Sequence, residues 1–260
     1  MLSLSSCSNK KMTSFKKSEQ YKLVWADEFD YTGLPDTSKW RYDIGGSGWG
    51  NNEKQFYRKE SLDNSFVKDG ILHIVALKEN YQNNDYTSTR LITNGKYTVK
   101  YGKIEVRAKL PKGNGTWPAI WMLGANIQEV GWPLCGEIDI MEHVGKDQNV
   151  VHVSLHSKLY NFLKNNQLTH FEKILDVTNS FHLYGIEWST KSIKFFIDNK
   201  LFYTATKGED GRVTTDEGWP FDKPFYLILN LAIGGNWGGE IDNSIFPTEM
   251  QIDYVRIYKK

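Results

Sequence analysis

The chain has 260 residues, of which 24% are charged and 40% are hydrophobic, and this composition excludes a mostly disordered chain. Its net charge is +1 and it has no basic stripe, which excludes a typical nucleic-acid binder. Two cysteines, Cys7 and Cys135, are too few for a disulfide framework, and no apolar run reaches the roughly 18 residues that a membrane span needs. Aromatic residues make up 14% of the chain, and their flat faces can pack a core or stack on sugars and other flat ligands.

The first 20 residues are polar and show no apolar periodicity, so we expect a disordered tail or a tether there. They lack the basic start and the apolar stretch of a complete secretory signal. Leu4-Ser5-Ser6-Cys7 nevertheless resembles the lipobox at which bacterial lipoproteins are cleaved and lipidated on the cysteine. This resemblance predicts a lipid anchor at Cys7 and an exported protein, held at the bacterial cell surface or in the periplasm. Without the anchor, we expect a secreted protein.

From residue 21 to residue 260, short apolar stretches alternate with turns rich in Gly, Asn, Asp and Pro, a pattern typical of many short strands. Few stretches keep a helical period for long, so little helix is expected. Strands are predicted at Ile71–Leu77, Gly102–Ala108, Ser192–Asp198, Phe225–Ile233 and Ile252–Tyr258. Asp198-Asn199-Lys200 is typical of a hairpin turn. No repeat or linker divides this part, which predicts one all-β domain over residues 21–260, either a sandwich or a barrel.

Three carboxylates lie within six residues of an otherwise apolar strand, at Glu137, Asp139 and Glu142. Alternate side chains of a regular strand share a face, so Glu137 and Asp139 point the same way and Glu142 points the opposite way. One extra residue in a β-bulge, near Ile140 and Met141, would return Glu142 to the face of the other two. A solvated strand face is the plain alternative, but the asymmetric spacing and the nearby tryptophans favour a catalytic cluster.

Glycoside hydrolysis uses such a cluster, because one carboxylate must be ionised as nucleophile or base while a second stays protonated to donate to the leaving oxygen. Asp139, between the two glutamates, can hydrogen-bond to Glu137 and orient it. A metal site is a weaker interpretation, since hard cations take about six to eight oxygens, often from a loop.

The segment Glu137-Ile-Asp-Ile-Met-Glu142 resembles the catalytic signature of glycoside hydrolase family 16, in its laminarinase-like, bulged form. Other segments resemble landmarks of that family, in its order: Trp25–Asp30, Gly48–Gln55, Tyr101–Arg107, Gly115–Trp121 and Leu229–Trp237. Together they span nearly everything from Trp25 to Tyr258. The resemblance implies a concanavalin-like jelly-roll β-sandwich of two antiparallel sheets, with a substrate cleft across the concave sheet.

The same resemblance implies a retaining endo-acting enzyme that cleaves β-1,3 or mixed-linkage β-1,3-1,4-glucans without a cofactor. Carried onto this sequence, it makes Glu137 the nucleophile, Glu142 the general acid/base and Asp139 their helper. With that role, Glu142 is expected to have the higher pKa of the two glutamates, raised by its acidic neighbours. Its partner would be the glucan substrate alone, and a monomer is the default expectation.

Four tryptophans are expected to touch substrate by resemblance to the family: Trp117, Trp121, Trp132 and Trp237. Trp117 and Trp121 have the same strand parity, Trp132 lies five residues before Glu137, and Trp237 is in a segment rich in Gly and Asn. Core packing is the better interpretation for four others: Trp25, Trp40, Trp188 and Trp219.

Asn51, Glu53 and Arg90 also resemble sugar-contacting positions of the family, although such polar groups could instead brace loops. His156 shares strand parity with His152, but no third and fourth ligand completes a metal site. The resemblance to the family implies instead that His156 hydrogen-bonds near Glu142 or the leaving sugar.

A structural Ca²⁺ often lies on the convex face in this family. The matching positions here are Glu28, the carbonyl of Gly70, and Asp253, which would tie the two ends of the chain together through oxygen ligands. Asp253 could equally be an exposed acid of a strand.

Other functions remain open at this point. A non-catalytic glycan-binding module could use the same sandwich but would have no need for paired glutamates. A galactanase of the agarase or carrageenase type shares the fold, yet no Arg or Lys cluster near the cleft motifs suits sulfate esters. Transglycosylation is a further alternative, and it depends on how well the acceptor sites exclude water.

Overall fold

The computed structural model describes residues 20–260, so the predicted anchor at Cys7 lies outside the described residues. Nearly all regular structure in this part is strand, as expected. In the described region, no helix is both long and apolar enough to span a bilayer.

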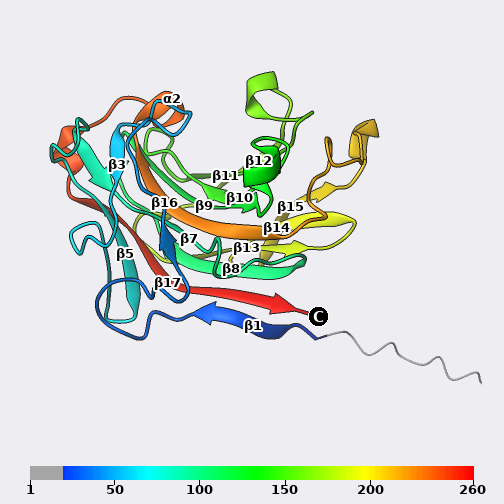
Figure 1. Cartoon of the computed structure of the whole chain (residues 1–260), viewed down its shortest axis with the longest axis horizontal. Helices are drawn as coiled ribbons and strands as arrows, with labels where there is room; N and C mark the ends of the chain where they lie inside the picture. The colour runs from blue at the N-terminus through cyan, green and yellow to red at the C-terminus, as the bar shows by residue number, and fades with distance from the viewer. Residues whose placement is uncertain (1–19) are drawn as a thin grey trace, which may run out of the picture.

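The larger of two antiparallel sheets has eight strands, and β1 joins it by pairing with β17. In spatial order its other strands are β15 (Lys200–Thr206), β14 (Ser192–Ile197), β13 (His182–Trp188), β8 (Gly102–Lys109), β17 (Thr248–Lys259), β5 (Ile71–Ala76) and β4 (Ser65–Lys68). Strand β1 (Lys22–Asp27) therefore places the start of the described chain beside its end (Figure 1).

The second sheet has seven strands and provides the floor of the cleft described below. Its spatial order is β12 (Leu168–Lys173), β11 (Val150–His156), β10 (Glu137–Glu142), β9 (Thr116–Gly124), β16 (Phe225–Ile233), β7 (Arg90–Ile92) and β2 (Arg41–Tyr42). It curves over the first sheet, and loops rise beyond its outer face at both ends (Figure 1).

Short elements complete the fold. A parallel pair, β3 (Gln55–Tyr57) and β6 (Tyr86–Ser88), is the exception to the antiparallel pattern. The helical pieces have three or four residues each: α1 (Ile127–Val130), α2 (Gly235–Gly238), and the 3₁₀ turns η1 (Phe162–Lys164), η2 (Glu209–Gly211) and η3 (Asn243–Ile245).

One hydrophobic core fills the space between the two sheets, because alternate residues of each strand point inward. On β9, for example, Ile120 and Met122 are fully buried, while Trp117 and Trp121 on the other face are partly exposed. Three of the four tryptophans expected in the core are almost completely buried: Trp40, Trp188 and Trp219. Trp25 packs against the core from its rim.

The predicted strands agree with the structure to within a few residues. Phe225–Ile233 is β16 over its full length, and Asp198 and Asn199 form the turn between β14 and β15. The jelly-roll sandwich of two antiparallel sheets is confirmed, and with it the choice of a sandwich over a barrel.

Candidate active site

The β-bulge predicted in the carboxylate strand is present in β10. Against β9, Asp139 pairs with Trp121 and Met141 with Ile120, so Ile140 is the extra residue. Ile140 and Met141 both enter the core, at 2% and 0% exposure. Glu142 therefore returns to the cleft side with Glu137 and Asp139, and all three line the same cleft.

Gly136 allows β10 to begin directly beside a packed wall. Its φ is +83°, and a Cβ atom there would lie 2.6 Å from Cγ of Pro220. Both the left-handed backbone and the close approach require glycine, so the residue before Glu137 is set by geometry.

Each of the two glutamates accepts a hydrogen bond from a different indole. Trp132 donates from Nε1 to Oε2 of Glu137 at 3.0 Å, and Trp117 donates from Nε1 to Oε1 of Glu142 at 3.0 Å. These donors fix the orientation of both carboxyl groups and leave the other oxygen of each free of the indole.

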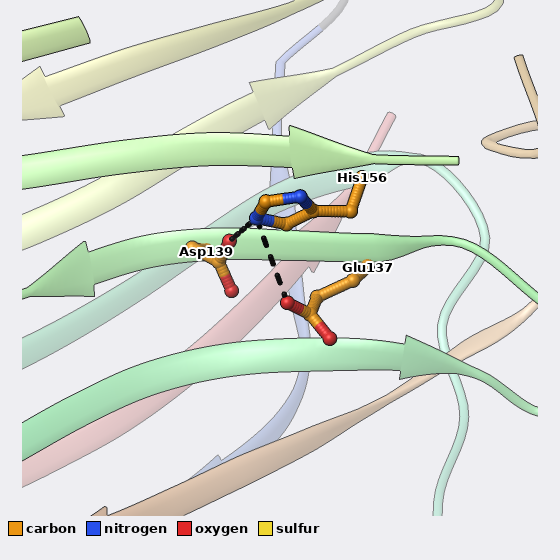
Figure 2. A group of neighbouring side chains, drawn as sticks. All are labelled: Glu137, Asp139 and His156. Carbon is orange, nitrogen blue, oxygen red and sulfur yellow. Dashed lines mark ion pairs between the residues drawn. The ribbon is translucent and has the colours of Figure 1, made fainter. Parts of the chain in front are cut away.

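Asp139 lies between the glutamates, is 2% exposed, and faces His156 from β11 (Figure 2). Nε2 of His156 is 3.2 Å from Oδ2 of Asp139 and 3.7 Å from Oε1 of Glu137. Ligand atoms of these three residues lie within 4.8 Å of one another, so they could hold a cation, though they would supply only a few of the oxygens that a hard cation takes. His156 thus lies directly beside Asp139 and Glu137, and its charge also acts on Glu142. Its hydrogen bond near Glu142 or to the leaving sugar stays a prediction.

Burial raises the pKa of Glu137 and of Glu142 to about 8, and the charge of Asp139 adds to the rise in both. Burial also raises the pKa of Asp139 well above its usual range. The expected difference between the two glutamates is not seen. Desolvation, the largest cause for each, acts on both, so the acidic neighbours of Glu142 do not set it apart.

The carboxylates lie in a cleft of about 820 Å³ on the outer face of the seven-stranded sheet. All eight residues predicted to bind substrate line it: Asn51, Glu53, Arg90, Trp117, Trp121, Trp132, His156 and Trp237. The structure therefore brings together side chains that are as far apart in the sequence as Asn51 and Trp237. Their contacts with a sugar stay predictions.

Arg90 is held between two indoles on one side of the carboxylates. Its guanidinium carbon lies 4.6 Å from the ring centre of Trp49 and 4.7 Å from that of Trp121. Nε of Arg90 is 3.1 Å from Oδ2 of Asp43, so an ion pair holds the guanidinium in this position.

A chain of hydrogen bonds joins the same wall to Glu53. Trp121 donates to Asn230 at 2.7 Å, Asn230 donates to the hydroxyl of Tyr57 at 3.0 Å, and that hydroxyl donates to Glu53 at 3.3 Å. Burial raises the pKa of Glu53, and hydrogen bonds from Gln55, Asn51 and Tyr57 oppose the rise. Glu53 both faces the cleft and braces its wall, so the two interpretations of this residue are compatible.

Aromatic rings also lie beside Glu142. Trp237 meets Trp117 edge-on with ring centres 5.4 Å apart, and His152 meets Trp237 edge-on at 4.9 Å. Burial lowers the pKa of His152, which favours its neutral form. His152 is thus part of this wall.

Several residues that line the cleft were not among the predicted site residues. They are Trp49, Asn230, His152, Ser154, Phe162, Leu163, Gln167 and Thr169, among others. Asn230 had a signal, as a polar residue inside the apolar run of β16, and Trp49 had one as a large ring in a loop of Gly and Asn. Phe162 and Leu163 lie in the segment Lys158–Lys173, which the sequence marks as one of the loops that set substrate choice, but nothing in the local sequence singles out these two residues.

The three positions predicted to bind Ca²⁺ lie close together by strand register. Asp253 is the bulged residue of β17. Its neighbour Ile252 pairs with Leu72, near the start of β5 and two residues after Gly70. Val255, two residues after Asp253, pairs with Asp27, the neighbour of Glu28. Both oxygens of Glu28 accept hydrogen bonds from Arg256, and Asp253 pairs with Arg107. A cation at this place would compete with two guanidinium groups.

Residues 48–256 match the family model described as glycosyl hydrolases family 16. The chain is 47% identical to a beta-glucanase of Rhodothermus marinus, over 94% of this chain and 87% of that protein. It is 39% identical to glucan endo-1,3-beta-glucosidase A1 of Niallia circulans, over 92% of this chain and 38% of that longer protein.

The fold matches solved structures equally well. The laminarinase of Rhodothermus marinus superposes with a TM-score of 0.89 at 46% identity, over 92% of this chain and 98% of that one. At this coverage, the similarity extends over both sheets.

Proposed function

The chain belongs to glycosyl hydrolases family 16, and from this premise we propose how its cleft works. The protein is an endo-acting β-1,3(4)-glucanase that cleaves β-1,3-glucans, mixed-linkage β-1,3-1,4-glucans, or both. The observation that carries the assignment to this site is the bulge in β10, because it turns Glu142 into the cleft beside Glu137.

The reaction is a double displacement. The carboxylate of Glu137 attacks the anomeric carbon while Glu142 donates its proton to the glycosidic oxygen, so the leaving sugar departs with a new hydroxyl and a glycosyl ester forms. The Glu142 carboxylate then takes a proton from water, and the resulting hydroxide attacks the same carbon and breaks the ester. Both carboxyl groups return to their starting states, and the two glutamates and one water supply every proton and bond, so no cofactor is needed.

Asp139 couples the protonation of the two glutamates. Its charge raises the pKa of both glutamates, and it contacts His156 at 3.2 Å. We propose that the two glutamates and Asp139 titrate as one coupled cluster, so that one glutamate is ionised while the other stays protonated.

The test is incubation of the protein with laminarin, barley mixed-linkage glucan, agarose and carrageenan, with the products separated by chromatography. We expect short oligosaccharides from one or both glucans. A folded protein that cuts none of the four yet binds glucan would instead be a glycan-binding module. Release of products from agarose or carrageenan alone would make it a galactanase.

Charge in the cleft argues against a sulfated galactan. Among the described residues that line the cleft, Arg90 is the single Lys or Arg, and Asp43 and two indoles already engage its guanidinium. A sulfate ester would find no free cationic partner there.

We further propose a structural Ca²⁺ held by Glu28, the carbonyl of Gly70, and Asp253. Support comes from the register that brings these positions together and from their oxygen donors. The measurement is thermal unfolding in CaCl₂ and in EDTA. A rise in the midpoint with Ca²⁺ that is lost in Asp253→Asn would support the site, and identical midpoints would reject it.

We also propose that the protein is an exported lipoprotein anchored at Cys7, with residues 1–20 as tether and residues 21–260 as one catalytic domain. The lipobox-like Leu4–Cys7 supports the anchor. Mass spectrometry of the N-terminal peptide from cells would detect a lipid on Cys7 or exclude it. The cleft is complete within one chain, which supports a monomer, and light scattering would measure its mass.

A further inference from the structure

The loop between β11 and β12, residues 157–167, presents two apolar side chains to solvent at the edge of the cleft. Phe162 is 43% exposed and Leu163 is 71% exposed, and both line the cleft. Large apolar side chains exposed together beside a binding cleft are typical of a recognition surface.

This loop is braced from within, so the exposure of its tip is a built feature. Asn161 is 2% exposed, and its side-chain amide donates to the carbonyl of Ser157 at 2.9 Å. Its backbone N–H donates to the side-chain oxygen of Asn166 at 3.0 Å. The residue that precedes Phe162 is therefore tied to both ends of the loop.

A segment distant in the sequence holds the loop from the side. The guanidinium of Arg212 lies 4.4 Å from the ring centre of Tyr160 and donates to the carbonyl of Asn166 at 2.9 Å. The backbone N–H of Val213 donates to the hydroxyl of Tyr160 at 3.0 Å. In Figure 1 the loop and the segment of η2 rise on the same side of the concave sheet.

The tip continues the aromatic surface that begins at the nucleophile. Phe162 lies 5.4 Å from Trp132 between ring centres, and Trp132 is the residue that donates to Glu137. Phe162 also meets His156 edge-on at 5.8 Å.

The loop lies on the opposite side of the carboxylates from the wall of Arg90. Arg90 is on β7 and Asn230 on β16, whereas β11 and β12 are on the far side of β10 in the sheet order. A chain of sugars that crosses the carboxylates from the Arg90 wall would therefore run onto this loop.

We propose that Phe162 and Leu163 form a platform that binds the glucose units lying beyond the scissile bond on the β11–β12 side. The platform gives the protein a preference for long glucan chains. Gln167 and Thr169, which line the cleft beside it, offer an amide and a hydroxyl to the sugar hydroxyls. A glucan is the occupant because the platform is continuous with the cleft, and the inference rests on the proposed function.

The experiment measures affinity against chain length in the catalytically inactive Glu137→Gln background. Binding of β-1,3-gluco-oligosaccharides of two to eight units is measured by calorimetry, with and without Phe162→Ala and Leu163→Ala together. We expect these two substitutions to weaken binding of the longest oligosaccharides about 10-fold and of the shortest much less, because only long chains reach the platform. When Phe162→Trp takes the place of Phe162→Ala, most of the affinity for the longest oligosaccharides should return.

Leu175→Ala is the matched control, because Leu175 is also 71% exposed and does not line the cleft. It should leave the dependence on chain length unchanged, and thermal unfolding should show all variants folded. An equal loss at every length, or no loss, would overturn the platform.

The unsubstituted protein is assayed for glucan hydrolysis in parallel. If the unsubstituted protein hydrolyses glucan but the platform variants bind oligosaccharides with the same dependence on chain length, the platform alone is overturned. No hydrolysis and no glucan binding by the unsubstituted protein overturns the proposed function itself.

Discussion

The two glutamates of β10 have the same kind of indole partner and pKa values raised equally to about 8, so the free protein does not distinguish their roles. Substrates with different leaving groups do distinguish the roles of the two glutamates. A general acid matters only while the leaving group is poor, whereas a nucleophile matters for every substrate.

Glu142→Gln should therefore lose about a thousand-fold in turnover of laminarin but release the aryl group quickly from an activated aryl glucoside. The glycosyl ester would then accumulate, and added azide, which needs no base, should restore turnover. Glu137→Gln should lose activity on both substrates. If azide instead rescues Glu137→Gln and the product retains its configuration, then Glu137 is the general acid/base and Glu142 is the nucleophile.

The raised pKa values also make stability depend on pH. Burial holds the folded pKa of Glu142 near 8, above the ordinary value of 4.5, so the folded state binds more protons than the unfolded state between these values. Stability should be greatest below about pH 4 as far as this group is concerned, and fall as pH rises toward 8. Glu142→Gln should gain on the order of 1 to 3 kcal/mol over the unsubstituted protein at pH 9 and nothing at pH 4.

Urea unfolding at the two pH values measures this difference. Asp139 and Glu137 titrate with Glu142, so the change belongs to the cluster as a whole. A gain that is the same at pH 4 and at pH 9 would contradict the linkage, since a packing effect does not follow the protonation of Glu142.

Arg90 is the residue for which a conservative substitution should be most damaging. Lysine keeps the charge but has no planar group to stack between Trp49 and Trp121. Arg90→Lys should lower kcat/KM on laminarin about 10-fold and shift tryptophan fluorescence. Arg58→Lys is the control, because Arg58 stacks on Tyr81 and does not line the cleft. Equal effects of the two substitutions would show that the stack is irrelevant to the cleft.

At the scale of elements, the bulge of β10 gives one strand two different tasks. Its core side takes both Ile140 and Met141, while its cleft side takes all three acids. The bulge thus separates the residues that stabilise the sandwich from those that react.

Met141→Ala should lower the free energy of unfolding by about 2 to 4 kcal/mol, because it leaves a cavity in the core next to the bulge. Turnover per folded molecule should change by no more than about three-fold, since the side chain points away from the cleft. Denaturant unfolding and laminarin kinetics on the same preparation measure both. A loss of turnover with unchanged stability would mean that Met141 sets the position of Glu142.

At the scale of the whole molecule, β1 and β17 bring the ends of the described chain together, and Glu28 and Arg256 link them by two hydrogen bonds. The arginine lowers the pKa of Glu28 through these bonds. Both side chains are about one-third exposed, so solvent screens the pair. Arg256→Gln should cost no more than about 1 kcal/mol, and the cost should vanish in 1 M salt, as measured by denaturant unfolding. A larger cost that persists in high salt would mean that the pair is a main tie between the two ends.

Features that depend on neighbouring residues follow from the order of the amino acids alone. Strand alternation is local, so the all-β class, β16, the turn at Asp198 and Asn199, and the bulge that reunites Glu142 with Glu137 could all be derived from spacing. The landmark segments added the family and the jelly roll.

Features that depend on residues far apart in the chain emerge only in the folded protein. Trp49, Arg90 and Trp121 stack because three separate elements meet, and Tyr57 meets Asn230 across 173 positions of sequence. The pKa values of the two glutamates are alike because burial dominates them, and burial is set by everything that packs around the cleft. Phe162 reaches the cleft because Arg212 and Tyr160 hold its loop there. Contacts of this kind arise only when the folded chain brings distant segments together, so no local pattern records them.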